Sequence, residues 1–166
     1  MFIHSLPVFF THIGYASPLE LLVIFLGLFI VLFMATQARG ENGPLQQGDY
    51  LFAAWSGKVK LAWAFWPFFL VLNASLYAAD ILATTGIFTV SSWDDIHIAL
   101  LLPIVWWATS VWRCSANSTA RAWGACARLM TISVFFEYGL KLLIRMDYPR
   151  LFFNCEELLL DYGSCF

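Results

Sequence analysis

One stretch of the sequence constrains the fold more than any other: residues 21–35 contain no polar side chain. Extended to residues 19–37, the stretch approaches the roughly 20 residues that a helix needs to cross a bilayer. Ser17 and Pro18 stand where a helix begins, and charge, Gly and Pro within residues 39–44 stand where it ends. We therefore predict a first membrane-spanning helix over residues 19–37.

Three further segments, residues 61–80, 96–112 and 122–144, are also long and apolar enough to predict spanning helices. The last of them is the least apolar, because it carries three charged residues. Composition agrees, since 61% of the 166 residues are hydrophobic and 12% are charged, which is too apolar for a soluble domain. We predict an all-α, polytopic bundle of four transmembrane helices, a single domain over residues 1–166 with a C-terminal tail at residues 145–166.

The distribution of Lys and Arg predicts an orientation. The first connection contains Arg39, Lys58 and Lys60, the second contains none, and the third contains Arg113 and Arg121. By the positive-inside rule, the first and third connections are cytoplasmic and both termini lie outside. The formal net charge of -2 gives no basic surface for nucleic acid, so no nucleic-acid partner is expected.

Aromatic and basic residues gather at the predicted cytoplasmic surface. Trp at headgroup depth beside Arg or Lys is typical of residues that anchor a protein in the membrane interface. The residues that we assign to this role are Trp55, Trp63, Trp66, Trp112, Arg113, Asn117, Trp123 and Arg128. In the long first connection, the apolar residues from Tyr50 to Trp55 predict a short amphipathic segment lying in that interface. Membrane lipids are therefore expected partners.

The four cysteines fall into two pairs by position. Cys155 and Cys165 lie in the tail that is predicted to be outside, where an oxidising compartment favours a disulfide. Cys114 and Cys126 lie on the cytoplasmic side, where thiols stay reduced. Four helices with four cysteines resemble the quinone-coupled thiol oxidase family, but that family requires a CxxC pair that this sequence lacks.

The histidines do not predict a metal or haem site. His4, His12 and His97 are all expected near the outer face, but no two share a helix at i, i+4 spacing. A haem needs axial ligands that project into the bundle, whereas His97 lies at the end of a predicted helix. We expect polar side chains in the membrane interface, with no metal and no cofactor.

The fourth predicted helix carries charge inside the membrane. At about 1.5 Å per residue from Ala122, Glu137 lies about 22 Å into a hydrocarbon layer of about 30 Å. Lys141 follows four residues later, so the two side chains can pair on one helix face. A structural ion pair and a proton or cation site both stay open as interpretations. Asn73 is a third intramembrane polar candidate.

Two stretches, residues 55–66 and 111–128, resemble a pattern in small proteobacterial inner-membrane proteins. The pattern reads W-x-G, then L-W-x-x-F-W entering one helix, with V-W-R-S-A-x-N linking the last two helices. This sequence departs from it at Ala62 and Cys114. The resemblance implies a bacterial inner membrane, hence periplasmic termini, and implies no chemistry.

The leading functional hypothesis is a non-catalytic small inner-membrane subunit that self-assembles into a homo-oligomer or joins a larger membrane complex. An alternative is an oligomeric channel or transporter-like module, in secretion, phage defence or toxin immunity, with Asn73, Glu137 and Lys141 along a polar path. A third is a redox or cofactor-binding membrane enzyme.

Overall fold

The computed structural model describes residue 10, residues 17–37 and residues 50–147. Within these parts of the chain all regular structure is helical and no strand occurs, which confirms the all-α prediction. The helices, in chain order, are α2 (Pro18–Ala35), the short α3 (Tyr50–Trp55), α4 (Leu61–Thr84), α5 (Val90–Cys114) and α6 (Arg121–Asp147). The predicted Cys155–Cys165 disulfide lies outside the described residues.

Three of these helices have the length and apolarity of membrane spans: α2, α4 and the Ser91–Cys114 part of α5. They show that the chain is a membrane-spanning protein. Helix α6 has 27 residues and would reach about 40 Å, but its charged side chains make it less apolar than the other three. The fourth span therefore stays a prediction.

Capping residues set the start of α2. The Ser17 side chain accepts a hydrogen bond from the Glu20 amide at 3.2 Å, and the Glu20 carboxylate accepts one from the Ser17 amide at 2.7 Å. This capping box satisfies two of the amides that a helix N-terminus leaves unpaired, and Pro18 fits the first helical turn. The rest of the helix consists of the apolar residues 21–35 from which it was predicted.

Helices α4 and α5 both extend beyond their predicted ranges at the turn that joins them. Helix α4 continues to Thr84, so Asp80 lies inside the helix instead of marking its end. Helix α5 begins at Val90, because Thr89 caps it by accepting a hydrogen bond from the Ser92 amide at 3.2 Å. Each helix therefore carries polar residues into the bundle that the sequence placed in a loop.

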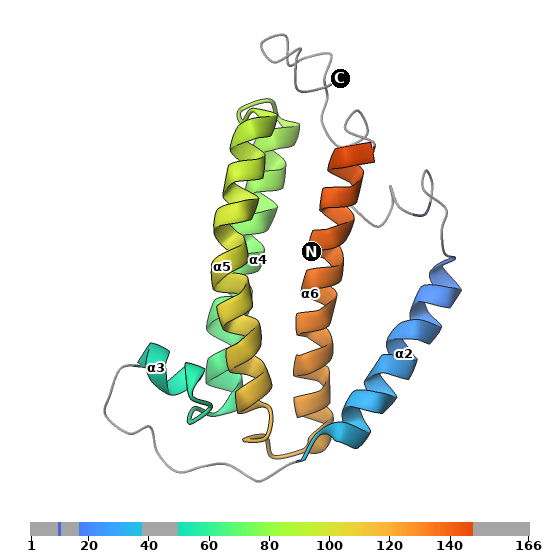
Figure 1. Ribbon diagram of the computed structural model, residues 1–166, viewed down its shortest axis with the longest axis vertical. Helices are drawn as coiled ribbons and strands as arrows, with labels where there is room; N and C mark the ends of the chain where they lie inside the picture. Colours follow the sequence, from blue (N-terminus) through green and yellow to red (C-terminus); the bar gives the residue numbers. More distant parts are fainter. Residues whose placement is uncertain (1–9, 11–16, 38–49, 148–166) are drawn as a thin grey trace.

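The helices lie side by side in a row in Figure 1. Helices α4 and α5 form an antiparallel pair, α6 packs against α5, and α2 packs against α6 at an incline. Short α3 lies across the end of α5. The core between α4 and α5 is aromatic: the Trp107 indole donates to the Phe65 carbonyl at 3.2 Å, and the Phe69 ring stacks on that of Phe65 at 4.9 Å.

Helix α2 packs against α6 but leaves most of its own side chains exposed. Leu32 is its one buried residue, and large apolar side chains such as Leu22, Val23 and Met34 are exposed. Its contacts with α6 include an edge-to-face pair of Phe25 and Phe136, with ring centroids 5.9 Å apart. In a bilayer this outer surface faces lipid or another protein.

One end of the long helices is basic, whereas the opposite half carries more acidic than basic residues, with Lys141 and Arg145 as the basic ones in the part of the chain that the structure describes. The basic end is the one at which α3 lies, and the described residues 50–60 and 113–128 contain no carboxylate. The basic residues of this end are Lys58, Lys60, Arg113, Arg121 and Arg128. The acidic residues of the opposite half are Glu20, Asp80, Asp94, Asp95, Glu137 and Asp147.

Candidate functional site

Four titratable side chains from three helices gather in the half of the bundle away from α3. Asp80 comes from α4, His97 from α5, and Glu137 and Lys141 from α6. His97 is 1% exposed and the other three are 3% exposed. Burial of so many ionisable groups is costly unless they compensate one another, and it marks a candidate site in a membrane protein. We call these four residues the charge cluster.

Asp80 is the centre of the charge cluster. Its carboxylate accepts a hydrogen bond from the Lys141 ammonium at 2.5 Å and another from the Trp93 indole at 3.1 Å. The three side chains come from α4, α6 and α5, so one carboxylate joins three helices. A charged hydrogen bond in a buried place is stronger than one in water, because the local dielectric constant is low.

Lys141 has the predicted ion pair with Glu137 and also a second, closer carboxylate partner. The nearest Glu137 oxygen lies 4.0 Å from the Lys141 nitrogen, which is an ion-pair distance but too long for a hydrogen bond. Asp80 takes the closer position, which helical spacing did not predict. The reason is that α4 extends past Asp80 and brings a carboxylate from another helix, which spacing within α6 cannot reveal.

His97 is buried in the charge cluster, not in the membrane interface as predicted. Its ring lies against Trp93 with centroids 3.7 Å apart, and its Nδ1 is 2.9 Å from the Trp93 carbonyl. Its Nε2 lies 3.8 Å from Asp80, too far for a hydrogen bond. The Tyr138 hydroxyl donates to the His97 carbonyl and so fixes α5 against α6.

The formal charges of the charge cluster sum to zero only if the cluster holds an additional proton. With neutral His97, two carboxylates and one ammonium give a net charge of about −1 in a place from which water is excluded. Among the described residues, His97 Nε2 and Glu137 Oε2 are buried without a hydrogen-bond partner. A proton on either atom brings the net charge to zero. These two atoms are therefore the candidate positions for an additional proton.

A second ion pair lies beside the charge cluster, nearer the helix ends. Arg145 on α6 contacts Asp94 on α5 at 3.0 Å, and both side chains are partly exposed. Arg145 is one turn beyond Lys141, and Asp94 is one turn before His97. Polar groups thus continue from the buried cluster toward the surface along α5 and α6.

Asn73 does not join Glu137 and Lys141 in a hydrogen-bonded group. Its amide nitrogen donates to the Phe69 carbonyl of its own helix at 2.7 Å, and its Oδ1 is buried without a partner within the described chain. It precedes Asp80 by two helical turns, about 10 Å along α4. The structure therefore keeps Asn73 as a separate polar position.

The predicted interface anchors lie at the α3 end. Residues of the two stretches 55–66 and 111–128 contact one another there. The Arg113 guanidinium lies 4.7 Å above the Trp55 ring and donates to the Trp55 carbonyl at 2.8 Å. The Asn117 amide donates to the carbonyls of Gly57 at 2.7 Å and Val59 at 3.2 Å. The segment before α4 is thus fastened to the end of α5.

The other basic anchor also stacks on an indole. Arg128 lies 5.1 Å from the Trp112 ring centroid and donates to the Ser115 hydroxyl at 2.8 Å. The Trp112 indole donates to the Thr131 hydroxyl at 2.8 Å. These contacts join α5 to α6, so Trp112 and Arg128 act as interhelical contacts as well as surface residues.

The Tyr50 hydroxyl satisfies a backbone carbonyl that a proline leaves without its helical donor in α4. Pro67 has no amide hydrogen, so the Trp63 carbonyl one turn earlier loses its usual helical donor. The Tyr50 hydroxyl donates to this carbonyl, which holds α3 against α4. Partial burial raises the pKa of the Tyr50 phenol.

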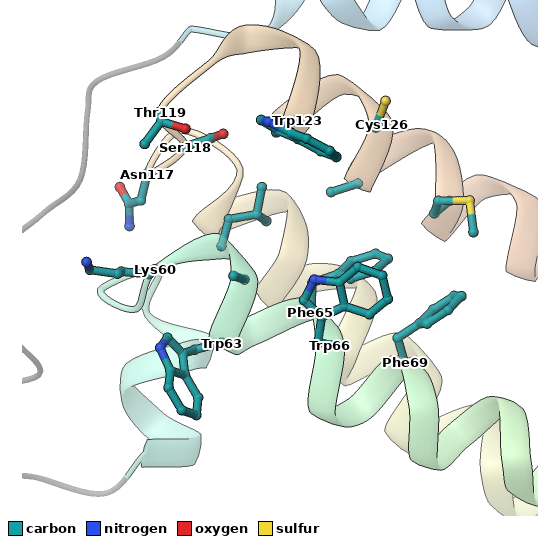
Figure 2. Close-up of a pocket in the computed structure, with 14 residues that line it drawn as sticks. Lys60, Trp63, Phe65, Trp66, Phe69, Asn117, Ser118, Thr119, Trp123 and Cys126 are labelled. Carbon is teal, nitrogen blue, oxygen red and sulfur yellow. The ribbon is translucent and has the colours of Figure 1, made fainter.

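The remaining anchors surround a groove between α4 and α6 at the same end (Figure 2). Its volume is about 500 Å³. The residues that we use to define this α4–α6 groove are Lys60, Trp63, Trp66, Phe69, Trp123 and Met130. More than half of the surface of Trp63, Trp66 and Trp123 is exposed, as expected for indoles at a membrane surface.

The two described cysteines are unpaired thiols. Cys114 is buried and lies 3.5 Å from the Ala54 carbonyl, whereas Cys126 lines the α4–α6 groove. Within the described ranges no three His, Cys, Asp or Glu side chains are placed to hold a metal ion. Comparison of the chain with protein-family models, curated proteins and solved structures gave no match.

Proposed function

We propose that the chain is a non-catalytic subunit of a membrane assembly, a four-helix protein of the bacterial inner membrane with both termini periplasmic. One observation carries the proposal. Helix α2 buries a single residue in its own chain and presents large apolar side chains outward. Helices in membranes associate through close packing, and α2 has a long face available for a second copy or another subunit.

Photo-crosslinking from α2 tests this proposal. p-Benzoylphenylalanine placed at Val23 or Met34, both exposed, is expected to form protein crosslinks in native membranes. The same probe at Phe25 is the control, because that ring faces Phe136 and should react within the chain. Crosslinks from Val23 and Met34 to lipid alone would contradict the proposal.

A second function, a proton-translocating or proton-sensing module, is favoured by the charge cluster. Its support is the unpartnered Glu137 Oε2, buried beside the Asp80–Lys141 pair. A carboxyl group of this kind changes charge when a proton arrives, and the change acts on contacts between three helices. The partly exposed Arg145–Asp94 pair offers a polar route to one surface.

Proton flux into liposomes that contain the purified chain and a pH-sensitive dye tests the second function. Glu137→Gln is expected to abolish the flux while the folded protein remains. Glu20→Gln is the matched control, because Glu20 is exposed at the start of α2 and an amide oxygen can still accept from the Ser17 amide. Equal flux in wild type and in Glu137→Gln would remove this function and leave the subunit proposal intact.

A further inference from the structure

We propose that the α4–α6 groove binds one anionic phospholipid, with the phosphate beside Lys60 and an acyl chain along Phe69 and Met130. The groove is open on the side that would face the bilayer, since Trp63, Trp66 and Trp123 at its rim are exposed. Its volume of about 500 Å³ lies within the range of small-ligand sites, about 300 to 1,000 Å³.

The polarity of the groove changes along its length as that of a lipid does. Lys60, Asn117, Ser118 and Thr119 lie together at one side of the close-up in Figure 2, where the polar headgroup would lie. The rings of Phe65 and Phe69 lie further along α4. From Lys60 to Phe69 the helix rises about 14 Å, so the apolar part runs into the depth at which acyl chains lie.

The charge at the polar end selects an anion. Lys60 is the one charged side chain among the described residues that line the groove. Helices α4 and α6 both begin at this end, and neither has an acidic residue in its first turn. The positive ends of their dipoles therefore add to the ammonium, which favours a phosphate over a neutral group.

A lipid fits this combination better than a protein helix or a soluble anion does. A partner helix would need a long apolar face with a carboxylate at one end, whereas every anionic phospholipid carries that pattern. A soluble phosphate would leave the aromatic part of the groove empty. On the proposed orientation the groove opens in the cytoplasmic leaflet, in which anionic lipids attract Lys and Arg at the surface.

Native mass spectrometry of the full chain tests the site. The protein is exchanged into mild detergent with equal amounts of phosphatidylglycerol and phosphatidylcholine. Wild type is expected to retain one phosphatidylglycerol in preference to phosphatidylcholine. Lys60→Gln is expected to lower that retention about fivefold, the effect of one lysine charge near a lipid surface. Equal retention of the two lipids by wild type would overturn the proposal.

Lys58→Gln is the matched control, because Lys58 is exposed two residues away and does not line the groove. Its retention should stay within twofold of wild type, and equal loss in both variants would mean diffuse surface attraction and no site. Ala62→Phe, which fills the groove, should also displace the lipid, whereas Val71→Phe on the exposed part of α4 should not. Retention unchanged by Lys60→Gln and by Ala62→Phe would overturn the proposal, with folding verified by circular dichroism.

Discussion

The Lys141 ammonium on α6 lies 2.5 Å from the Asp80 carboxylate on α4, although 61 positions separate the two residues in the sequence. The Trp93 indole of α5 binds the other oxygen of the same carboxylate. Asp80 therefore has a partner on each neighbouring helix, and Glu137 stays at the side with one oxygen unpartnered. This unequal role of the two carboxylates leads to the first two predictions.

Asp80→Asn should destabilise the bundle by about 1.5 to 3 kcal/mol, the cost of losing a charged hydrogen bond in a buried place. Unfolding by SDS in mixed micelles measures the change. Asp94→Asn is the control, because the Asp94–Arg145 pair is partly exposed and should contribute less than about 1 kcal/mol. Similar losses in the two variants would show that Asp80 is not the central partner of Lys141.

Glu137→Gln alone should change stability by less than about 1 kcal/mol, because Lys141 keeps its closer partner. Combined with Asp80→Asn, it leaves the Lys141 ammonium buried without a counterion. The double variant should therefore lose about 3 to 5 kcal/mol, more than the sum of the single variants. Additive losses in the same unfolding assay would mean that Lys141 reaches solvent.

Gly124→Ala and Gly139→Ala should change stability in opposite directions, although both glycines are in α6. A Cβ at Gly124 would lie 2.7 Å from the Ser115 carbonyl oxygen and 2.8 Å from Thr36 Cγ2, so the variant should lose about 1 to 3 kcal/mol. A Cβ at Gly139 meets nothing within 4 Å, so better helix propensity should add about 0.5 to 1 kcal/mol. A neutral Gly124→Ala variant would mean that α2 and α6 do not approach closely there.

Arg113→Lys should weaken the attachment of the segment before α4, because lysine cannot both stack on Trp55 and donate to its carbonyl as the guanidinium does. We expect a loss of about 1 kcal/mol and faster proteolysis between α3 and α4. Arg121→Lys is the control, since Arg121 is exposed at the start of α6. Proteolysis at the wild-type rate in Arg113→Lys would contradict the attachment.

Cysteine labelling tests the predicted orientation. In a background with the four native cysteines replaced by serine, Lys58→Cys should react with an impermeant thiol reagent only after the membrane is opened. Ile87→Cys, in the exposed turn between α4 and α5, should react in intact cells. The reverse pattern would place both termini in the cytoplasm.

The sequence predicted the helices better than the site. The apolar run of α2 needs no tertiary information, because its length alone defines a span. The start of α5 was missed because the predicted span began at residue 96, after Asp94 and Asp95, whereas Thr89 caps the helix seven positions earlier. The Asp80–Lys141 pair could not be predicted, because helix packing decides which of two carboxylates lies nearer the ammonium. The helical spacing of Glu137 and Lys141 identified two of the four cluster residues.

The difference in charge between the two ends has a consequence for insertion. Lys58, Lys60, Arg113 and Arg121 all stand at one end of the molecule. Moving one elementary charge across a potential of about 100 mV changes its energy by about 2.3 kcal/mol. In the predicted orientation, a membrane potential that is negative inside would favour the basic end on the cytoplasmic side and oppose inversion of the protein, so an energised membrane would itself stabilise that orientation.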